Sequence, residues 1–127
     1  MDRDPISIYE VNALVGRETV SCERLIIYPD QVDGGSKVWR FSDYAQVRWI
    51  PATEAIPFAR LIFLTEEDVR AGVKIILMPF LPEENQLLFP MRNYGIEALN
   101  RYVEELFTEV DTAFRRFTGQ NPPAVLQ

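Results

Sequence analysis

The side chains of this chain that could do chemistry are carboxylates and one thiol. Its 127 residues include 19 Asp and Glu, one cysteine and no histidine. Histidine is the most common general base and the usual partner of a nucleophilic Ser or Cys, so its absence removes the best-known routes to nucleophilic catalysis. Cys22 stands within a predicted strand, and a buried, unreactive thiol is its simplest interpretation, since only Arg24 offers a cation nearby.

The acidic clusters are each explained by local structure. Residues 30–35 lack the alternating oxygen ligands and the closing Glu of a calcium loop. Residues 66–68 suit the first turn of a helix, where the helix dipole favours negative charge. Glu83 and Glu84 suit the tip of a hairpin.

Motifs for other chemistry are also missing. Zinc sites need several Cys or His residues. No phosphate loop, dinucleotide fingerprint or nucleophile elbow occurs. We therefore predict no catalytic, cofactor-binding or metal-binding residues and a protein that is not an enzyme. An enzyme that uses two carboxylates in one cleft is the alternative, because sequence does not show their separation.

Composition predicts one acidic globular domain over residues 1–127, with a partly flexible tail over 118–127. The net charge is −6, with 13 Lys and Arg against 19 acids, so we expect no nucleic-acid partner and favour a protein with a basic surface. One cysteine excludes an internal disulfide. The longest apolar run, residues 75–81, is far shorter than the ~20 residues that span a bilayer. We expect a cytoplasmic protein with no transmembrane segment.

The clearest structural signal is a helical seam near the C-terminus. Its apolar residues recur at steps of three and four. They are Ile96, Leu99, Val103, Leu106, Val110, Ala113 and Phe117. Tyr102, Phe107 and Phe114 widen this face, which suits packing on a sheet better than a coiled coil. We predict a long amphipathic helix capped by Asn93 and ending near Gly119.

The rest of the chain is rich in strand signals. Alternating or continuous apolar segments with turn residues between them predict strands over residues 19–28, 37–41, 44–50, 58–64, 73–80 and 86–89. Residues 30–36 and 51–57 are predicted loops. Thr65 and Asp68 predict the start of a short helix near 66–71. Over residues 5–15 we favour a short helix started by Asp4 and Pro5, with a strand as the alternative.

These elements predict an α+β fold. We expect an antiparallel sheet of five to seven strands covered by the long C-terminal helix, with short helices at the N-terminus and near 66–71. Two known architectures share much of this order: the small secretion-chaperone type, and the pleckstrin-type barrel of seven strands and one C-terminal helix. The analogy is one of element order, and no sequence motif identifies either.

Candidate binding residues come from the aromatic strands and the long helix. Trp39 and Trp49 could form an apolar surface, although filling the core explains them as well. Arg40 and Arg48 lie on the other side of those strands. The acids of the long helix could dock a basic partner or simply face solvent. The predicted partner-binding residues are Trp39, Arg40, Arg48, Trp49, Tyr102, Glu104, Glu105 and Phe107.

The sequence favours a non-enzymatic protein-binding module, such as a dedicated chaperone, an inhibitor or immunity-type antagonist, or an adaptor. One alternative is a pleckstrin-like lipid- or ligand-binding barrel whose pocket is rimmed by Lys37, Arg40 and Arg48. Another is a structural subunit of a larger assembly. We also expect a homodimer, formed through strands or through the remaining apolar face of the long helix.

Overall fold

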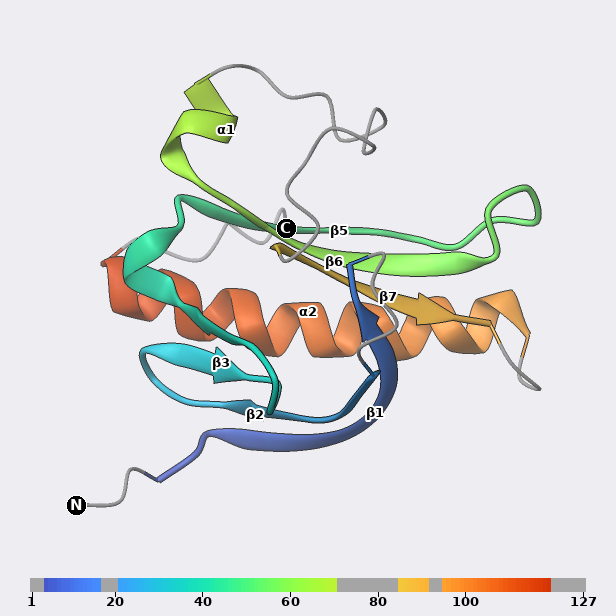
Figure 1. Cartoon of the computed structure of the whole chain (residues 1–127), viewed down its shortest axis with the longest axis horizontal. Helices are drawn as coiled ribbons and strands as arrows, with labels where there is room; N and C mark the ends of the chain where they lie inside the picture. Colours follow the sequence, from blue (N-terminus) through green and yellow to red (C-terminus); the bar gives the residue numbers. More distant parts are fainter. Residues whose placement is uncertain (1–3, 17–20, 71–84, 92–94, 120–127) are drawn as a thin grey trace, which may run out of the picture.

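The computed structural model describes residues 4–16, 21–70, 85–91 and 95–119. Seven strands precede one long helix, with a 3-10 turn (η1) and a short helix between them (Figure 1). The elements are β1 (Ser7–Val15), β2 (Ser21–Ile27), β3 (Gln31–Asp33), β4 (Val38–Arg40), η1 (Phe41–Asp43), β5 (Gln46–Ile50), β6 (Phe58–Leu64), α1 (Glu66–Arg70), β7 (Gln86–Pro90) and α2 (Ile96–Thr118).

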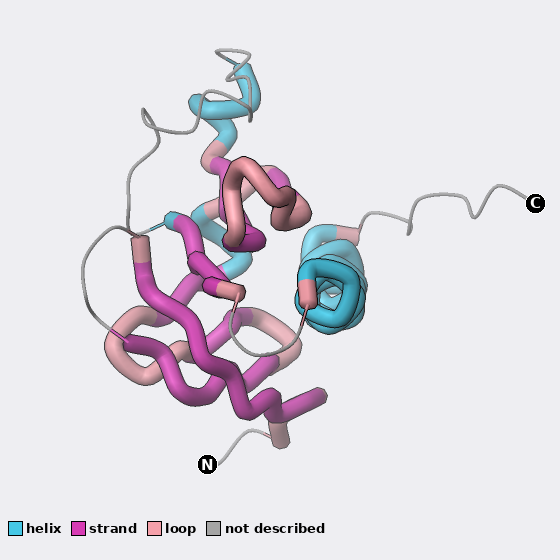
Figure 2. The backbone as a smooth tube through the Cα atoms, turned by 90° about the vertical axis from the view of Figure 1, so that its right-hand side faces the viewer, coloured by secondary structure: helices cyan, strands magenta, loops and turns pink. Residues whose placement is uncertain are grey.

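The strands form one seven-stranded sheet in the order β4-β3-β2-β1-β7-β6-β5, and neighbouring strands are antiparallel. β1 is the central strand that joins the two halves. The sheet curls around one side of α2, which Figure 2 shows nearly end-on. The α+β class, the antiparallel sheet and the long covering helix are therefore confirmed.

The favoured N-terminal helix is wrong, because residues 7–15 form β1. Side chains along β1 alternate, with Tyr9, Val11 and Ala13 more buried than Ile8 and Glu10 between them. Pairing with β2 satisfies the backbone groups along one edge of β1, and this pairing outweighs the local helix-start signal of Asp4 and Pro5.

The predicted loop over residues 30–36 is also partly wrong, since it contains β3. Val32 is fully buried there. Turns remain on both sides of β3: before it the Tyr28 N–H donates to the Gln31 carbonyl at 2.8 Å, and the second turn follows Asp33. The Gly34 N–H donates to the Lys37 carbonyl at 2.8 Å. A Cβ on Gly34 would lie 2.9 Å from the Trp39 indole, so glycine is required for this close packing.

The remaining strand predictions within the described residues are confirmed. Segments 19–28, 37–41, 44–50, 58–64 and 86–89 contain β2, β4, β5, β6 and β7. The predicted strand over 73–80, the hairpin tip at Glu83–Glu84 and the cap Asn93 lie outside the described residues, as do residues 120–127 of the predicted tail.

The predicted start of the short helix and the predicted end of the long helix at Gly119 are confirmed, whereas Asn93 is wrong as the cap of the long helix, because its N-cap is Gly95. Before α1, the Asp68 N–H donates to Thr65 Oγ1 at 3.1 Å and the Thr65 N–H donates to Asp68 Oδ2 at 3.0 Å, a reciprocal capping box. α2 has Gly95 at its N-cap without a side-chain cap bond, and it ends at Gly119, whose φ is +78°.

The core lies between the sheet and α2. The buried residues of α2 are Leu99, Val103, Leu106, Val110, Asp111, Ala113 and Phe114. The Phe114 ring meets Phe41 edge-on with centroids 5.5 Å apart. Phe117, predicted in the seam, is 45% exposed at the end of the helix. The rest of the seam covers the sheet as predicted.

Candidate functional site

The two tryptophans do not form an exposed surface. Trp39 is fully buried and stacks on Phe63 with ring centroids 5.2 Å apart. Trp49 is half-buried and packs against the same core. Both side chains lie on the inner face of the sheet. The prediction of Trp39 as a surface binding residue is therefore wrong, whereas that of Trp49, which keeps part of its surface exposed, stays a prediction.

The predicted arginines lie apart from the long helix's acidic side. Arg40 and Arg48 are exposed on β4 and β5, the two edge strands of the sheet. Lys37 precedes β4 and is half-buried. None of the three lines the cavities described below.

The two flanks of α2 have different surroundings. On one flank, Phe107 is half-buried against the core, and Asn100 binds the backbone of Ala52. The Ala52 N–H donates to Asn100 Oδ1 at 2.7 Å, and Asn100 Nδ2 donates to the Ala52 carbonyl at 3.0 Å. This flank is therefore fixed to the loop that follows β5.

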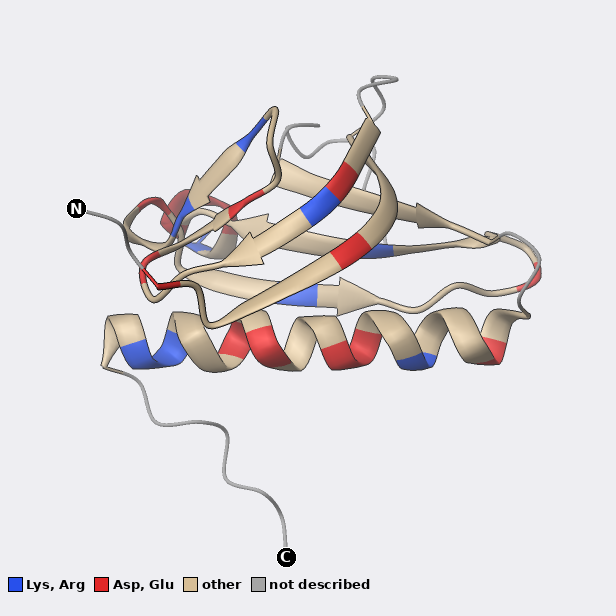
Figure 3. Cartoon of the chain, turned by 90° about the horizontal axis from the view of Figure 1, so that it is seen from below, with Lys and Arg blue, Asp and Glu red and all other residues tan. Residues whose placement is uncertain are grey.

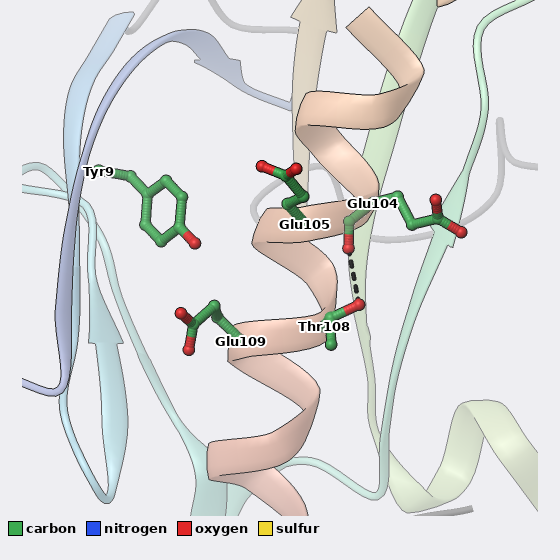
Figure 4. Close-up of a pocket in the computed structure, with 5 residues that line it drawn as sticks. All are labelled: Tyr9, Glu104, Glu105, Thr108 and Glu109. Atoms are coloured by element: carbon green, nitrogen blue, oxygen red, sulfur yellow. Dashed lines mark hydrogen bonds between the residues drawn. The ribbon is translucent and has the colours of Figure 1, made fainter. Parts of the chain in front are cut away.

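The other flank of α2 faces β1 across two cavities, which we call together the β1–α2 groove. One cavity, of about 410 Å³, is lined by Tyr9, Glu104, Glu105, Thr108 and Glu109 (Figure 4). The second, of about 430 Å³, is lined by Glu10, Val11, Asn12, Ala98 and Tyr102. Of the predicted residues, Tyr102 and Glu105 thus lie on this flank, whereas the Glu104 carboxylate points away from the cavity (Figure 4).

Two tyrosines connect the strand and the helix across this groove. The Tyr9 and Tyr102 rings meet at 70° with centroids 6.3 Å apart. The Tyr102 hydroxyl donates to the Glu10 carbonyl at 2.7 Å. The Glu10 carboxylate lies on the other side of this contact and pairs with Arg24 at 3.4 Å, where both side chains are largely exposed. Tyr9 thus lines one cavity and Tyr102 the other, and the contacts of these two tyrosines hold α2 to β1.

The first cavity is strongly acidic. Its five lining residues include no cation, and the carboxylates of Glu105 and Glu109 lie on the side of Tyr9, whereas the carboxylate of Glu104 points away (Figure 4). Burial raises the pKa of the Tyr9 hydroxyl, and the negative charges of Glu109 and Glu105 raise it further. Figure 3 shows acidic positions along the middle of α2 with arginines towards both ends. The cavity thus lies where the negative potential of the helix is concentrated.

Not every acid of α2 contributes to this surface. Asp111 is buried, and its Oδ2 accepts a hydrogen bond from Arg115 Nε at 2.9 Å. Its charge is therefore neutralised locally, which explains a late acid in the helix that the dipole alone disfavours.

Tyr9, Glu10 and Val11 are groove residues that the sequence does not predict, because its local pattern favours a helix over residues 5–15. The alternation of Tyr9, Val11 and Ala13 was the signal for a strand with these side chains on one face. Glu109 was recognised as a polar residue of the long helix, but its partner across the groove was not.

Comparison of the chain with protein-family models, curated proteins and solved structures finds no match. No described helix is long and apolar enough to cross a membrane. Among the residues that the structure describes, no group of three or more His, Cys, Asp or Glu side chains is arranged to hold a metal ion. What the structure itself shows is the class of fold: an α+β protein whose seven-stranded antiparallel sheet is covered by a C-terminal helix.

Proposed function

We propose that this chain is a non-enzymatic protein-binding module that receives a basic partner at the β1–α2 groove. The observation that supports this proposal is the convergence of the Glu105 and Glu109 carboxylates with Tyr9 on one cavity of about 410 Å³ (Figure 4). Two carboxylates beside a cavity whose lining residues include no cation repel one another, and a Lys or Arg side chain from a partner would relieve that repulsion.

The tyrosines suit the same role. An aromatic ring offers apolar contact area at a small entropic cost and attracts a cation to its face. Tyr9 lines the acidic cavity and is half-buried, so a guanidinium or ammonium group entering there would meet both a ring and carboxylates. The net charge of −6 would also speed the approach of a basic partner.

A dedicated chaperone, an inhibitor or immunity-type antagonist, and an adaptor all fit this proposal. The pleckstrin-like alternative shares the order of seven strands and one C-terminal helix. Its predicted rim residues Lys37, Arg40 and Arg48 line neither cavity of the groove, so this alternative would use another surface and stays a prediction. A homodimer and a structural subunit of a larger assembly stay predictions.

The proposal is tested by capturing partners from a native lysate on immobilised protein. The wild type is compared with the double variant Glu105→Lys/Glu109→Lys and with the matched control Glu54→Lys/Glu67→Lys, whose exposed carboxylates lie outside the groove. We expect proteins that bind the wild type and the control but not the groove variant, and that elute as salt rises. Equal capture by all three proteins contradicts the proposal.

A further inference from the structure

β1 pairs with β2 from Ser7 to Leu14, but its pairing with β7 involves only Leu14 and Val15. Within the described residues, no strand pairs with this second edge of β1 between Ser7 and Val11. An unpaired edge of this kind can add a strand from another chain.

The unpaired edge faces α2. Because the Glu10 carbonyl accepts from Tyr102, the Glu10 backbone groups point towards the helix and away from β2. Alternate residues of a strand direct their N–H and C=O groups to the same side, so Ile8 presents its backbone to the groove as well. The Tyr102 hydroxyl therefore donates to the Glu10 carbonyl, which could instead accept a hydrogen bond from the backbone N–H of an added strand.

The side chains beside this edge specify what such a strand would carry. A residue opposite Tyr9 would project to the side of the Tyr9 ring, where Glu105 and Glu109 line the cavity. The next residue would project to the other face. There Ile8 is 56% exposed and Ile6 44% exposed. The groove thus matches basic side chains on one face of a strand and apolar side chains on the other.

We propose that the partner contributes an extended segment of alternating basic and apolar residues, which adds as a strand to the β1 edge and displaces the Tyr102 hydroxyl from the Glu10 carbonyl. This inference rests on the proposed function and names the binding mode of the same groove. Main-chain hydrogen bonds would supply affinity, and the alternating side chains would supply specificity.

The test uses a short synthetic peptide in which lysine and valine alternate, with affinity measured by calorimetry. Two N-methylated versions carry the methyl groups on alternate residues, one version for each edge of the peptide strand. One version should bind at least about tenfold more weakly than the other, because only one edge of the peptide would pair with β1. Cross-strand contacts between peptide protons and the α protons of Ile8 or Glu10 should appear in NMR spectra.

Tyr102→Phe is the second variant. It keeps the ring contact with Tyr9 but removes the hydroxyl that competes for the Glu10 carbonyl, so the peptide should bind about two- to tenfold more tightly. Charge removal in Glu105→Gln/Glu109→Gln should weaken binding, whereas the control Glu54→Gln/Glu67→Gln should not.

The outcomes separate this inference from the proposed function. Charge-dependent binding in which both N-methylated peptides bind alike, or in which a peptide with separate lysine and valine blocks binds equally well, overturns strand addition and leaves the basic-partner proposal standing. Absence of binding by every lysine-containing peptide, together with equal lysate capture by the charge variants, contradicts both.

Discussion

Tyr9 is the residue at which the strand, the helix and the acidic surface meet. Its ring contacts Tyr102, and its hydroxyl lies in the cavity with Glu105 and Glu109. Burial and these two negative charges all raise the pKa of the hydroxyl above its ordinary value of 10.0. The native protein therefore holds this proton more tightly than the unfolded chain.

This linkage predicts a pH dependence with a definite sign. The stabilisation from a raised pKa is complete below the unfolded pKa of about 10 and is lost as pH rises through the higher folded pKa. Urea unfolding should thus show a free energy that falls in this alkaline range. The fall should be smaller in Tyr9→Phe.

Glu109→Gln should lower the Tyr9 pKa measured by tyrosinate absorbance, because it removes one of the two charges that raise it. Burial and Glu105 remain, so the pKa should stay above that of free tyrosine. Glu54→Gln removes the same charge outside the cavity and should leave the titration unchanged. A Tyr9 pKa that does not move in Glu109→Gln would refute this account of the cavity.

Asn100 is the corresponding residue on the opposite flank of α2. Its amide both accepts from and donates to the backbone of Ala52, which is 3% exposed. Asn100→Ala leaves both backbone groups without this partner and should lower the free energy of unfolding by about 1–3 kcal/mol in urea titrations. Arg101→Ala, at the exposed neighbouring position, should change it by less than about 0.5 kcal/mol. Equal effects of the two substitutions would contradict the role of Asn100.

At the scale of elements, the central face of α2 packs in the core, one flank is bound to the loop after β5, and the other flank borders the β1–α2 groove. Leu106, Val110 and Phe114 are at most 1% exposed. Phe107 remains half-buried on the flank near β5, and Tyr102 spans the groove to β1. Phe114 is therefore fully buried against the sheet, whereas the flank of α2 that carries Tyr102 borders the two cavities of the groove.

Leu106→Ala should lower the free energy of unfolding by about 2–5 kcal/mol, because it opens a cavity under the centre of α2. Thr112→Ala, on the exposed side of the same helix, should have an effect within about 0.5 kcal/mol. Chemical denaturation followed by circular dichroism measures both. A small effect of Leu106→Ala would show that α2 is not packed on the sheet as described.

The sequence predicts the elements whose hydrophobic periodicity is long and regular. It does not predict β1 and β3, whose structure depends on pairing with neighbouring strands. α2 and β6 follow from sustained patterns. β3 is only three residues long, too short for alternation to identify. β1 was misassigned because Asp4 and Pro5 resemble a helix start, while its pairing with β2 and β7 does not show in the local sequence pattern.

The candidate site was predictable only on its helical side. Tyr102, Glu104 and Glu105 were identified from the pattern of α2, but Tyr9 needed the knowledge that β1 lies beside that helix. Trp39 shows the converse: its residue type suggests an interface, and only the curl of the sheet around α2 places it in the core.

At the scale of the whole molecule, the proposed binding of a basic partner depends on where the negative charge lies. The chain has a net charge of −6, and α2 places the carboxylates of Glu105 and Glu109 on the groove (Figure 4). Arg40 and Arg48 are on the two edge strands of the sheet, outside that groove. A basic partner and an anionic one would therefore contact different parts of the surface.

The most direct test is to titrate ¹⁵N-labelled protein with the alternating lysine–valine peptide and follow the backbone amide shifts. We predict a contiguous set of shifts along β1 from Ser7 to Ala13 and along α2 from Ala98 to Glu109. They should weaken as salt is added and be lost in Glu105→Lys/Glu109→Lys. Saturable shifts centred on Lys37, Arg40 and Arg48, or no shifts in the β1–α2 groove, would contradict the central claim.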